Sequence, residues 1–384
     1  MKSIFLLTDS YYPEPTAAAK LLKDLTDKLL IKNKITVLSA ANKTNFMFKK
    51  NINIYSVKIP FIRSKNLFLK FLSELSMPII LYFHFFLKIN KTFDVLLCYS
   101  PSIFFVYFIK KTKKFFINSK KILILRDIFP DWTIQAKILH KKSLKYKYLK
   151  KVQRDLFELF DHIGVQAKTD INFIEKRFKK KCFGLYNWIK KQSNQKKNYS
   201  KLNKKFIFIG NLGLAQDTEF LTKIIKIISR KPEVTLTILG SGRGQKRIYM
   251  NNFKQFNNIN FLNKVKQSKL KKIIKKYDFG IISLKKEIEY NNFPGKFLMY
   301  LINNMAVFCY SSSKIELFKM IKKYEVGIAI SSKNTKIIEN KLKILINYNN
   351  NDFKFVKKNT NKLYNTFFRP DIALKKLENL IDGN

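Results

Sequence analysis

Residues 206–229 read FIFIGNLGLAQDTEFLTKIIKIIS. The stretch opens with a short apolar run, passes through a loop that contains glycine, and continues with apolar residues at helical spacing. A buried strand followed directly by an amphipathic helix is the repeating unit of a parallel sheet that helices cover on both faces. The same alternation runs along nearly the whole chain, which indicates the α/β class.

Two such sheets fit the alternation, one in each half of the chain. In the first half the expected strands are Ser3–Thr8, Ile35–Ala40, Ile52–Ile59, Asp94–Ser100, Lys121–Asp127, His162–Gln166 and Cys182–Tyr186. In the second half they are Phe206–Leu212, Val234–Gly240, Ile259–Val265, Phe279–Leu284, Ala306–Tyr310 and Val326–Ile330. Helices are expected at Ala17–Ile31, Thr218–Ser229, Ser268–Tyr277, Lys296–Asn303, Lys314–Tyr324 and over Asp352–Ile381, where apolar residues recur with helical spacing.

A polar segment separates the two halves. Residues 190–205 read KKQSNQKKNYSKLNKK, and so few apolar residues among Lys, Asn, Gln and Ser are typical of a linker. A chain of 384 residues has room for two or three domains. We therefore expect a first domain at residues 1–190, a linker at 191–205 and a second domain that begins at residue 206.

The chain is strongly basic, because 76 Lys and Arg against 26 Asp and Glu give a formal net charge of +50. A field of this sign attracts nucleic acid, anionic lipid or phosphorylated substrates. Only eight of the basic residues are Arg, and Lys is spread from end to end. Nucleic-acid-binding proteins usually concentrate their charge on one face and favour Arg for bidentate contacts. We therefore expect no nucleic-acid partner.

The cysteines predict neither a disulfide nor a metal site. Cys98, Cys182 and Cys309 lie far apart, each in an apolar run, as buried cysteines do in a reducing compartment. The apolar run at the N-terminus is too short for a secretory signal. These observations predict a cytoplasmic protein without a bound metal.

Residues 61–117 are unusually aromatic and are flanked by lysines. A spanning helix needs roughly 18–20 uninterrupted apolar residues, and the nearest run, Met77–Leu87, is too short and contains His84. Two interpretations stay open. The segment is a buried core helix with solvated lysines, or it is an interfacial surface where aromatic side chains enter the headgroup zone and lysines meet anionic lipid.

Polar residues follow two of the strands expected in the first half. The stretch 9–19 reads DSYYPEPTAAA, a proline-rich turn followed by small residues that open a helix and allow a ligand close to the backbone. The stretch 126–132 reads RDIFPDW and places an Arg, two carboxylates and a Trp at a strand's exit. Such residues indicate recognition of a hydroxylated or charged ligand, although a capped helix start and a structural Arg–Asp pair explain the two stretches equally simply.

Glycine-containing loops follow two strands in the second half. Residues 210–216 read GNLGLAQ and residues 240–244 read GSGRG, so backbone amides there can face phosphate oxygens. Their spacing matches neither the dinucleotide fingerprint nor the Walker A loop. Further on, Pro294 and Gly295 open a helix, and Lys296 adds a point charge where a diphosphate could sit. This helix start would stabilise a departing diphosphate without a metal.

Together these motifs resemble the retaining family-4 glycosyltransferases of the GT-B fold, especially the bacterial branch that adds N-acetylated amino sugars to lipid-linked surface polysaccharides. The motifs occur in the family's order and cover nearly the whole chain: residues 12–15 (YPEP), 126–132 (RDIFPDW), 187–189 (NWI), 210–216 (GNLGLAQ), 239–242 (LGSG), 294–296 (PGK) and 369–371 (RPD).

The resemblance implies two Rossmann-like doubly wound domains that face each other across a cleft. It implies a nucleotide-sugar domain at residues 206–365 and a closing helix at 366–384 that returns to the acceptor-binding first domain. The implied donor-binding residues are Gly210, Asn211, Gly213, Gln216, Gly240, Ser241, Gly242, Pro294 and Gly295. The implied acceptor-binding residues are Pro13, Glu14, Thr16, Ala17, Arg126 and Trp132, and the implied catalytic residues are Asp127, Asp131 and Lys296.

The chain departs from the family at a pair of glutamates that many members carry near the start of the Lys296 helix. Asn291 and Met299 stand at the two positions, and Glu287 and Glu289 are out of register. The basic pair usual after the first glycine loop is likewise replaced by Ala215 and Gln216. These departures concern the contacts to the donor sugar.

We therefore expect a metal-independent retaining glycosyltransferase without a cofactor. It would move a UDP-linked N-acetylated amino sugar to a lipid-linked glycan in O-antigen, capsule or lipopolysaccharide biosynthesis, at the inner face of the plasma membrane. Its partners would be the nucleotide diphosphate sugar, the lipid-linked acceptor and an anionic membrane surface. Two alternatives stay open: a non-hydrolysing nucleotide-sugar epimerase of the same fold, and a catalytically inactive nucleotide-sugar-binding protein.

Overall fold

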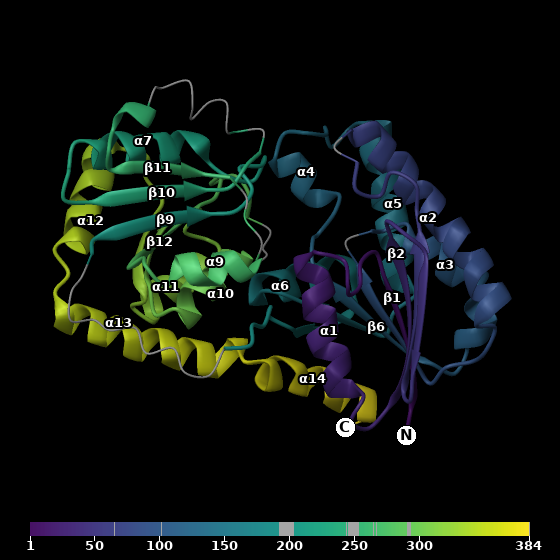
Figure 1. The fold of residues 1–384 in the computed structure, drawn as a ribbon. Helices are drawn as coiled ribbons and strands as arrows, with labels where there is room; N and C mark the ends of the chain where they lie inside the picture. Colours follow the sequence, from purple (N-terminus) through teal and green to yellow (C-terminus); the bar gives the residue numbers. More distant parts are fainter. Residues whose placement is uncertain are drawn as a thin grey trace. The chain divides into compact units, whose positions relative to one another are not determined.

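A computed structural model describes residues 1–64, 66–100, 102–191, 203–242, 244, 253–263, 265, 267–289 and 293–383 (Figure 1). The chain divides into two compact units, which are described separately below. Unit 1 comprises Met1–Asn187 and Pro370–Asn384, and unit 2 comprises Trp188–Arg369. Most of the expected linker, residues 192–202, lies outside the described residues.

Unit 1 is built on one eight-stranded sheet. Its strands are β1 (Ser3–Thr8), β2 (Lys34–Ala41), β3 (Asn45–Lys49), β4 (Ile52–Lys58), β5 (Val95–Ser100), β6 (Lys120–Leu125), β7 (His162–Val165) and β8 (Lys181–Gly184). They lie in the order β3-β4-β2-β1-β5-β6-β7-β8. All neighbours pair parallel except β3, which pairs antiparallel with β4 and was not expected from the sequence.

Helices cover this sheet. They are α1 (Ala17–Leu29), α2 (Leu67–Lys88), α3 (Phe105–Lys111), α4 (Asp131–Gln135), α5 (Leu144–Glu158), α6 (Lys168–Phe178) and α14 (Pro370–Asp382), with a 3₁₀ turn η1 (Lys113–Phe116). The last helix, α14, belongs to unit 1 because its buried face packs there and because Lys120 Nζ donates to Leu380 O at 2.7 Å. An ion pair of 3.1 Å joins Lys28 of α1 to Glu378 of α14.

Unit 2 is built on a six-stranded parallel sheet. Its strands are β9 (Lys205–Ile209), β10 (Thr235–Leu239), β11 (Ile259–Leu262), β12 (Phe279–Ser283), β13 (Ala306–Tyr310) and β14 (Gly327–Ile330), in the order β11-β10-β9-β12-β13-β14. Its helices are α7 (Thr218–Ser229), α9 (Gln267–Ile274), α10 (Gly295–Ile302), α11 (Glu316–Lys323), α12 (Thr335–Ile346) and α13 (Asn350–Leu363), with a 3₁₀ turn η2 (Phe253–Gln255) and a π turn η3 (Tyr364–Phe368).

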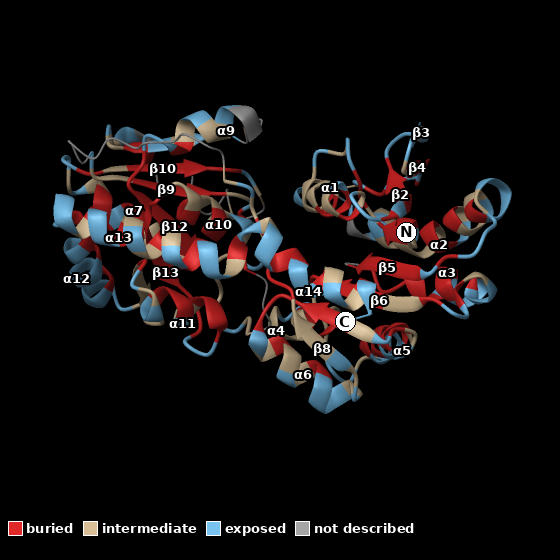
Figure 2. Ribbon diagram, turned by 90° about the horizontal axis from the view of Figure 1, so that it is seen from below, coloured by how far each residue is buried: buried red, intermediate tan, exposed pale blue. Residues whose placement is uncertain are grey.

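The two doubly wound parallel sheets confirm the fold class that the sequence predicts. Figure 2 shows the central strands of both sheets, such as β5, β9 and β10, as buried, and the long helices as buried on one side. The core of unit 2 lies between its sheet and α7, α12 and α13, with Phe206 stacked on Phe279 at a ring distance of 4.3 Å. Apolar runs form the strands because both of their faces are covered.

The chain reverses its direction of travel across each sheet once. In unit 1 the reversal lies between β1 and β5, and in unit 2 between β9 and β12. Ligands of doubly wound sheets bind beyond the carboxyl ends of the strands at such switch points. The loops after these four strands are therefore the places where function is expected.

The structure corrects the expectation that no apolar segment within residues 61–117 is long enough to span a membrane. Leu67–Lys88 form one continuous helix, although the longest uninterrupted apolar run in the sequence is shorter. Among the described residues, Phe68–Lys88 is the one helix that is long and apolar enough to cross a membrane, judged by length and composition. Only 28% of its most apolar window is buried inside the protein.

We predict that Gly280→Ala destabilises unit 2 by about 1–3 kcal/mol, the usual cost of overfilling a packed core. A Cβ at Gly280 would lie 2.3 Å from the ring of Tyr300. That ring cannot yield easily, because the Tyr300 hydroxyl lies 3.2 Å from the carbonyl oxygens of both Ile207 and Ile281. Urea unfolding followed by circular dichroism measures the change.

Gly295→Ala is the matched control, because a Cβ there meets nothing within 4 Å. Its unfolding free energy should stay within about 0.5 kcal/mol of the unmodified protein. Equal losses for the two variants would contradict the packing of Tyr300 on β12.

Candidate functional site

The two glycine loops of unit 2 touch each other. Gly210 and Gly240 have φ values of 120° and 156°, which L residues rarely adopt. A Cβ on Gly240 would lie 1.9 Å from the carbonyl oxygen of Gly210, so a side chain cannot be accommodated there. Leu212 N donates to Ser241 O at 3.0 Å and fixes the second contact between the loops. The loops that follow β9 and β10 therefore form one backbone surface at the carboxyl edge of the sheet.

The other predicted donor-binding residues of these loops lie on the same surface. A Cβ on Gly242 would meet Asn211 Oδ1 at 2.4 Å, and one on Gly213 would meet Asn211 Nδ2 at 2.9 Å. Asn211 and Ser241 are exposed, and Gln216 is half-buried. The structure thus brings together the glycine-loop residues that the sequence selects.

Lys296 reaches the same place from α10. Its Nζ donates to Gln216 Oε1 at 2.9 Å and lies 3.9 Å from the centre of the Phe208 ring. A Cβ on Gly210 would lie 3.5 Å from Lys296 Cε, so the lysine passes directly beside the first glycine loop. Burial lowers the pKa of Lys296 to about 7. The side chain is therefore close to half-protonated at neutral pH and becomes fully charged when an anion arrives.

The start of α10 is open to an anion. Pro294 is its N-cap residue and Gly295 its first residue, and no side chain from the described part of the chain caps it. The first turn contains no acidic residue. Unbonded N–H groups and the positive end of the helix dipole favour negative charge at such a start. Asn291, at the first position of the family's glutamate pair, lies outside the described residues, and Met299 is half-buried within α10.

Sequence reasoning missed an ion network beside the first glycine loop. Asp217 caps α7 by accepting from Phe220 N at 2.9 Å. Lys333, which follows β14, lies 2.8 Å from Asp217 Oδ2 and 3.0 Å from Glu219 Oε2. Ser283, at the end of β12, donates to Asp217 O at 2.6 Å. These contacts hold the strand ends on both sides of the unit 2 switch point in register.

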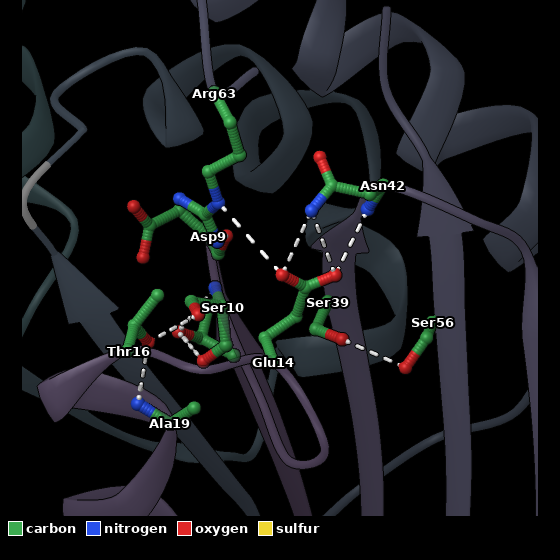
Figure 3. Close-up of polar contacts among 10 residues, drawn as sticks. Asp9, Ser10, Glu14, Thr16, Ala19, Ser39, Asn42, Ser56 and Arg63 are labelled. Carbon is green, nitrogen blue, oxygen red and sulfur yellow. Dashed lines mark hydrogen bonds and ion pairs between the residues drawn. The ribbon is translucent and has the colours of Figure 1, made fainter. Parts of the chain in front are cut away.

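In unit 1, the turn after β1 is tied to the next strands by charged side chains (Figure 3). The Glu14 carboxylate accepts from Asn42 N and Asn42 Nδ2, both at 3.0 Å, and lies 3.9 Å from Arg63 Nε. Arg63 Nη2 donates to Asp9 O at 3.3 Å. Thr16 caps α1 by accepting from Ala19 N at 3.0 Å. Glu14 and Thr16 therefore shape the loop, while Pro13 and Ala17 are exposed on it.

Asp9 is the residue of this turn that the structure leaves unsatisfied. Its Oδ1 atom is buried and has no hydrogen-bond partner among the described residues. Burial raises the pKa of Asp9, against the pull of the positive charges on Arg63 and Lys70. The negative charge of Asp127 adds to the rise, which places that predicted catalytic residue within electrostatic reach of Asp9.

A second carboxylate, half-buried and contributed by α2, lies within electrostatic reach of Asp9. Burial raises the pKa of Glu74, the charge of Asp9 raises it further, and a hydrogen bond from Ser102 and the charge of Lys70 oppose the rise. Ser102 follows β5, and Asp9 follows β1, so the two carboxylates flank the switch point of unit 1. The sequence signal for Glu74 is that it is the only acidic residue of α2.

The side chains of the RDIFPDW motif have different surroundings. Arg126 and Trp132 lie beside aromatic rings, whereas Asp131 is held by polar side chains. The Arg126 guanidinium lies 5.2 Å from the centre of the Tyr99 ring, and Gln166 Nε2 donates to Arg126 O at 2.7 Å. Trp132 is half-buried beside Phe129, at a ring distance of 6.5 Å.

Asp131 is occupied inside unit 1. Its Oδ2 lies 2.6 Å from Lys150 Nζ and accepts from Gln153 Nε2 at 3.1 Å. Its Oδ1 accepts from the Tyr146 hydroxyl at 3.2 Å. The prediction that Asp131 acts on the reacting sugar finds no support in this geometry, because both carboxylate oxygens are used to hold α4 on α5.

Two further features bear on the site. Among the residues that the structure describes, no group of three His, Cys, Asp or Glu side chains is arranged to hold a metal ion.

A cavity of about 480 Å³ in unit 2 is lined by residues of α11, β14, α12 and α13, including Gly327, Lys341 and Asp352. Gly327 begins β14, so this cavity does not coincide with the loops at the strand ends.

We predict that Asp131→Ala lowers the free energy of unfolding by about 3 kcal/mol, because it leaves the Lys150 ammonium buried without its counter-ion. Burial already lowers the pKa of Lys150 to about 8, against the opposing charge of Asp131. Denaturant unfolding of unmodified and variant protein measures the loss.

Asp155→Ala is the control, because its partner Lys110 is half exposed and such surface pairs contribute less than about 1 kcal/mol. If Asp131→Ala unfolds at the same denaturant concentration as the unmodified protein, the structural role of Asp131 is wrong.

No protein-family model matches the chain, and no curated protein matches it in sequence. Solved structures do match. The sucrose-phosphate synthase of Thermosynechococcus elongatus aligns with a TM-score of 0.73 at 9% identity, over 100% of this chain and 99% of that one. WaaG, a glycosyltransferase involved in lipopolysaccharide biosynthesis, aligns with a TM-score of 0.67 at 11% identity, over 99% and 100%. TarM of S. aureus aligns with a TM-score of 0.60 at 15% identity, over 79% and 58%. At these identities the similarity shows the fold, and the chain has the GT-B fold.

Proposed function

We propose that this chain is a retaining glycosyltransferase. It moves a sugar from a nucleoside diphosphate donor, a UDP-linked N-acetylated amino sugar, to a lipid-linked glycan in surface-polysaccharide assembly at the cytoplasmic face of the plasma membrane. The single observation that carries the proposal is Lys296, held beside the joined glycine loops and at the open start of α10. Proteins of the same fold support it. TarM is described in complex with α-GlcNAc-glycerol and UDP, and WaaG in lipopolysaccharide biosynthesis.

The donor's diphosphate would lie on the backbone surface of the glycine loops. Amides of these loops and the first turn of α10 donate to its oxygens, and Lys296 supplies a positive charge. When the bond between the sugar and the diphosphate breaks, its electron pair stays on the diphosphate oxygen. Groups fixed before the reaction stabilise that new charge without having to reorganise.

The acceptor would lie at the switch point of unit 1. Asp9 Oδ1 is a buried acceptor without a partner among the described residues, so a sugar hydroxyl that donates to it satisfies both groups. Glu74 and Asp127 lie within electrostatic reach of the same carboxylate. The acceptor oxygen bonds to the donor's anomeric carbon on the face that the diphosphate leaves, and its proton passes to a diphosphate oxygen. Asp9 then orients the acceptor.

A screen of nucleoside diphosphate sugars with purified protein tests the proposal. Transfer to a lipid-linked acceptor supports it, formation of an epimer identifies a nucleotide-sugar epimerase, and binding without turnover identifies an inactive binding protein. An Asp9→Asn variant should lose most of its transfer activity but keep donor affinity, because it changes only the acceptor site. Unchanged transfer by that variant removes Asp9 from the mechanism.

We predict that UDP binding at pH 8 takes up about one proton. At this pH Lys296, with a pKa of about 7, is mostly neutral before binding, and a bound diphosphate stabilises the ammonium form and raises its pKa. UDP itself is fully ionised at pH 8, since its last phosphate pKa is about 6. Titration calorimetry in buffers of different ionisation enthalpy measures the number of protons taken up.

The uptake should disappear in Lys296→Met, which should also bind UDP more weakly. Lys314→Met is the matched control in unit 2, because its side chain is exposed and pairs with Glu289, and it should take up the same number of protons as the unmodified protein. UDP binding with no proton uptake at pH 8 would separate Lys296 from the diphosphate site.

A further inference from the structure

Helix α2 (Leu67–Lys88) has an unusual distribution of side chains around its axis. One face is core: Met77, Leu81 and Phe85 are fully buried. Phe85 contacts Phe5 of β1 and Phe108 of α3, at ring distances of 5.3 and 5.6 Å. This face holds the helix on the sheet of unit 1.

The opposite face of α2 is apolar and exposed. Its exposed members follow the spacing i, i+4, i+11, i+15, i+18 and i+19 from Phe68, so they lie along one side of the helix. The exposed large apolar residues of this stripe are Phe68, Leu72, Ile79, Phe83, Phe86 and Leu87. Phe83 is 57% exposed and Leu87 is 72% exposed.

The charged side chains of α2 lie away from this stripe. Lys70, Ser73 and Glu74 fall at helical spacing with the buried Met77; Ser73 is buried, Glu74 is half-buried and Lys70 is exposed. A helix at an ordinary water-facing surface shows the reverse arrangement, with polar residues outside. The outer face of α2 is therefore built for an apolar environment.

The neighbouring helices extend the apolar surface and supply positive charge. The Tyr107 and Tyr148 hydroxyls, from α3 and α5, are 2.8 Å apart, and both tyrosines are exposed, as are Leu144 and Ile117. Lys111 lies 5.5 Å from the Tyr82 ring of α2, and Lys145 lies 5.9 Å from the Phe71 ring. Within residues 61–117, nine Lys and Arg stand against two Asp and Glu.

We propose that the outer face of α2 lies in the headgroup–acyl boundary of an anionic bilayer, with the helix axis parallel to the membrane plane. A second copy of this chain would have to bring the same positive surface against itself, which like charges oppose. Phosphatidylglycerol or a similar anionic lipid offers both an apolar interior for the aromatic side chains and negative charge for the lysines.

The same helix has the length of a spanning segment, but its packing argues against spanning. To cross a bilayer, α2 would have to withdraw Met77, Leu81 and Phe85 from the core of unit 1 and expose Phe5 and Phe108. It would also carry Lys70 and Glu74 into hydrocarbon, which is costly for charged groups. Lying flat requires none of these changes.

The membrane contact itself is inferred from α2 alone. Only its role, to bring unit 1 to a lipid-linked acceptor, rests on the proposed function. Glu74, on the first half of α2, lies within electrostatic reach of Asp9, which follows β1 at the unit 1 switch point. A bilayer on the outer face of α2 would therefore present lipid-linked substrate close to the carboxylates proposed to orient it.

Flotation of the full chain with vesicles tests the inference. Vesicles of phosphatidylcholine with a minority of phosphatidylglycerol should bind the protein, and binding should weaken as salt rises. Vesicles of phosphatidylcholine alone should bind much less. Extraction with alkaline carbonate should release the bound protein, because an interfacial helix is not anchored across the bilayer.

The double variant Phe83→Ser/Phe86→Ser should lower vesicle partitioning at least tenfold, because two exposed aromatic side chains no longer enter the bilayer. Ile337→Ser/Phe355→Ser is the matched control: it removes two exposed apolar side chains from unit 2 and should change nothing. Thermal melts should show that both variants fold like the unmodified protein, since all four side chains are about half exposed.

Undiminished binding of the double variant, no binding to anionic vesicles, or resistance to carbonate would each overturn the inference. Concentration-dependent dimerisation that the double variant abolishes would overturn it as well, because a second copy would then cover the face. Proton-linked UDP binding is measured without lipid. Failure on vesicles with intact UDP binding therefore rejects the membrane face alone, and loss of UDP binding with intact flotation rejects the donor site alone.

Discussion

Parallel strand pairing is the constraint on which every candidate site in this chain depends. Because neighbouring strands run the same way, all their carboxyl ends reach one edge of the sheet, and the loops and helix starts that follow them collect there. At the switch points the connections leave in opposite directions and leave room between them. In unit 2 this edge gathers the glycine loops and Lys296; in unit 1 it gathers Asp9 and Glu74.

Burial has the same effect on every charged group of the chain, and the groups around each one decide whether its charge is compensated. Desolvation disfavours the charged form of each group. Lys150 is buried with Asp131 at 2.6 Å, so the two satisfy each other and hold α4 on α5. Lys296 has an amide oxygen and an aromatic ring as neighbours, and Asp9 Oδ1 has no hydrogen-bond partner among the described residues. A group that folding desolvates without full satisfaction favours a ligand of complementary chemistry, an anion at Lys296 and a hydroxyl donor at Asp9, and these two groups lie at the two switch points.

Much of this arrangement is readable from the sequence, since strands buried on both faces appear as continuous apolar runs. The segments Ser3–Thr8 and Ala306–Tyr310 were expected with the bounds that the structure gives. The glycine loops were found because turns with such backbone angles require glycine. Lys296 was found because it directly follows Pro294 and Gly295, which mark the start of a helix. The edge strand β3 was missed, because pairing on one side only leaves its residues largely exposed and its pattern weak. Glu74 and Arg63 were missed because tertiary packing alone brings them to Asp9 from distant positions.

Helix α2 shows why the length of an apolar run in the sequence is not enough to recognise a long helix with one apolar face. Searching for an uninterrupted apolar run treats Lys70, Ser73 and Glu74 as breaks, although on a helix they share one side and leave the opposite side mostly apolar. The segment combines the core and interfacial interpretations that the sequence left open, because one side packs on the sheet and the other is exposed. A helix that exposes a stripe of large apolar side chains is stable in water only while its packed face outweighs the cost of the exposed one. Transfer of the exposed face to a lipid interface removes that cost without disturbing the packed face, so association with a membrane and retention of the fold are compatible in the same helix.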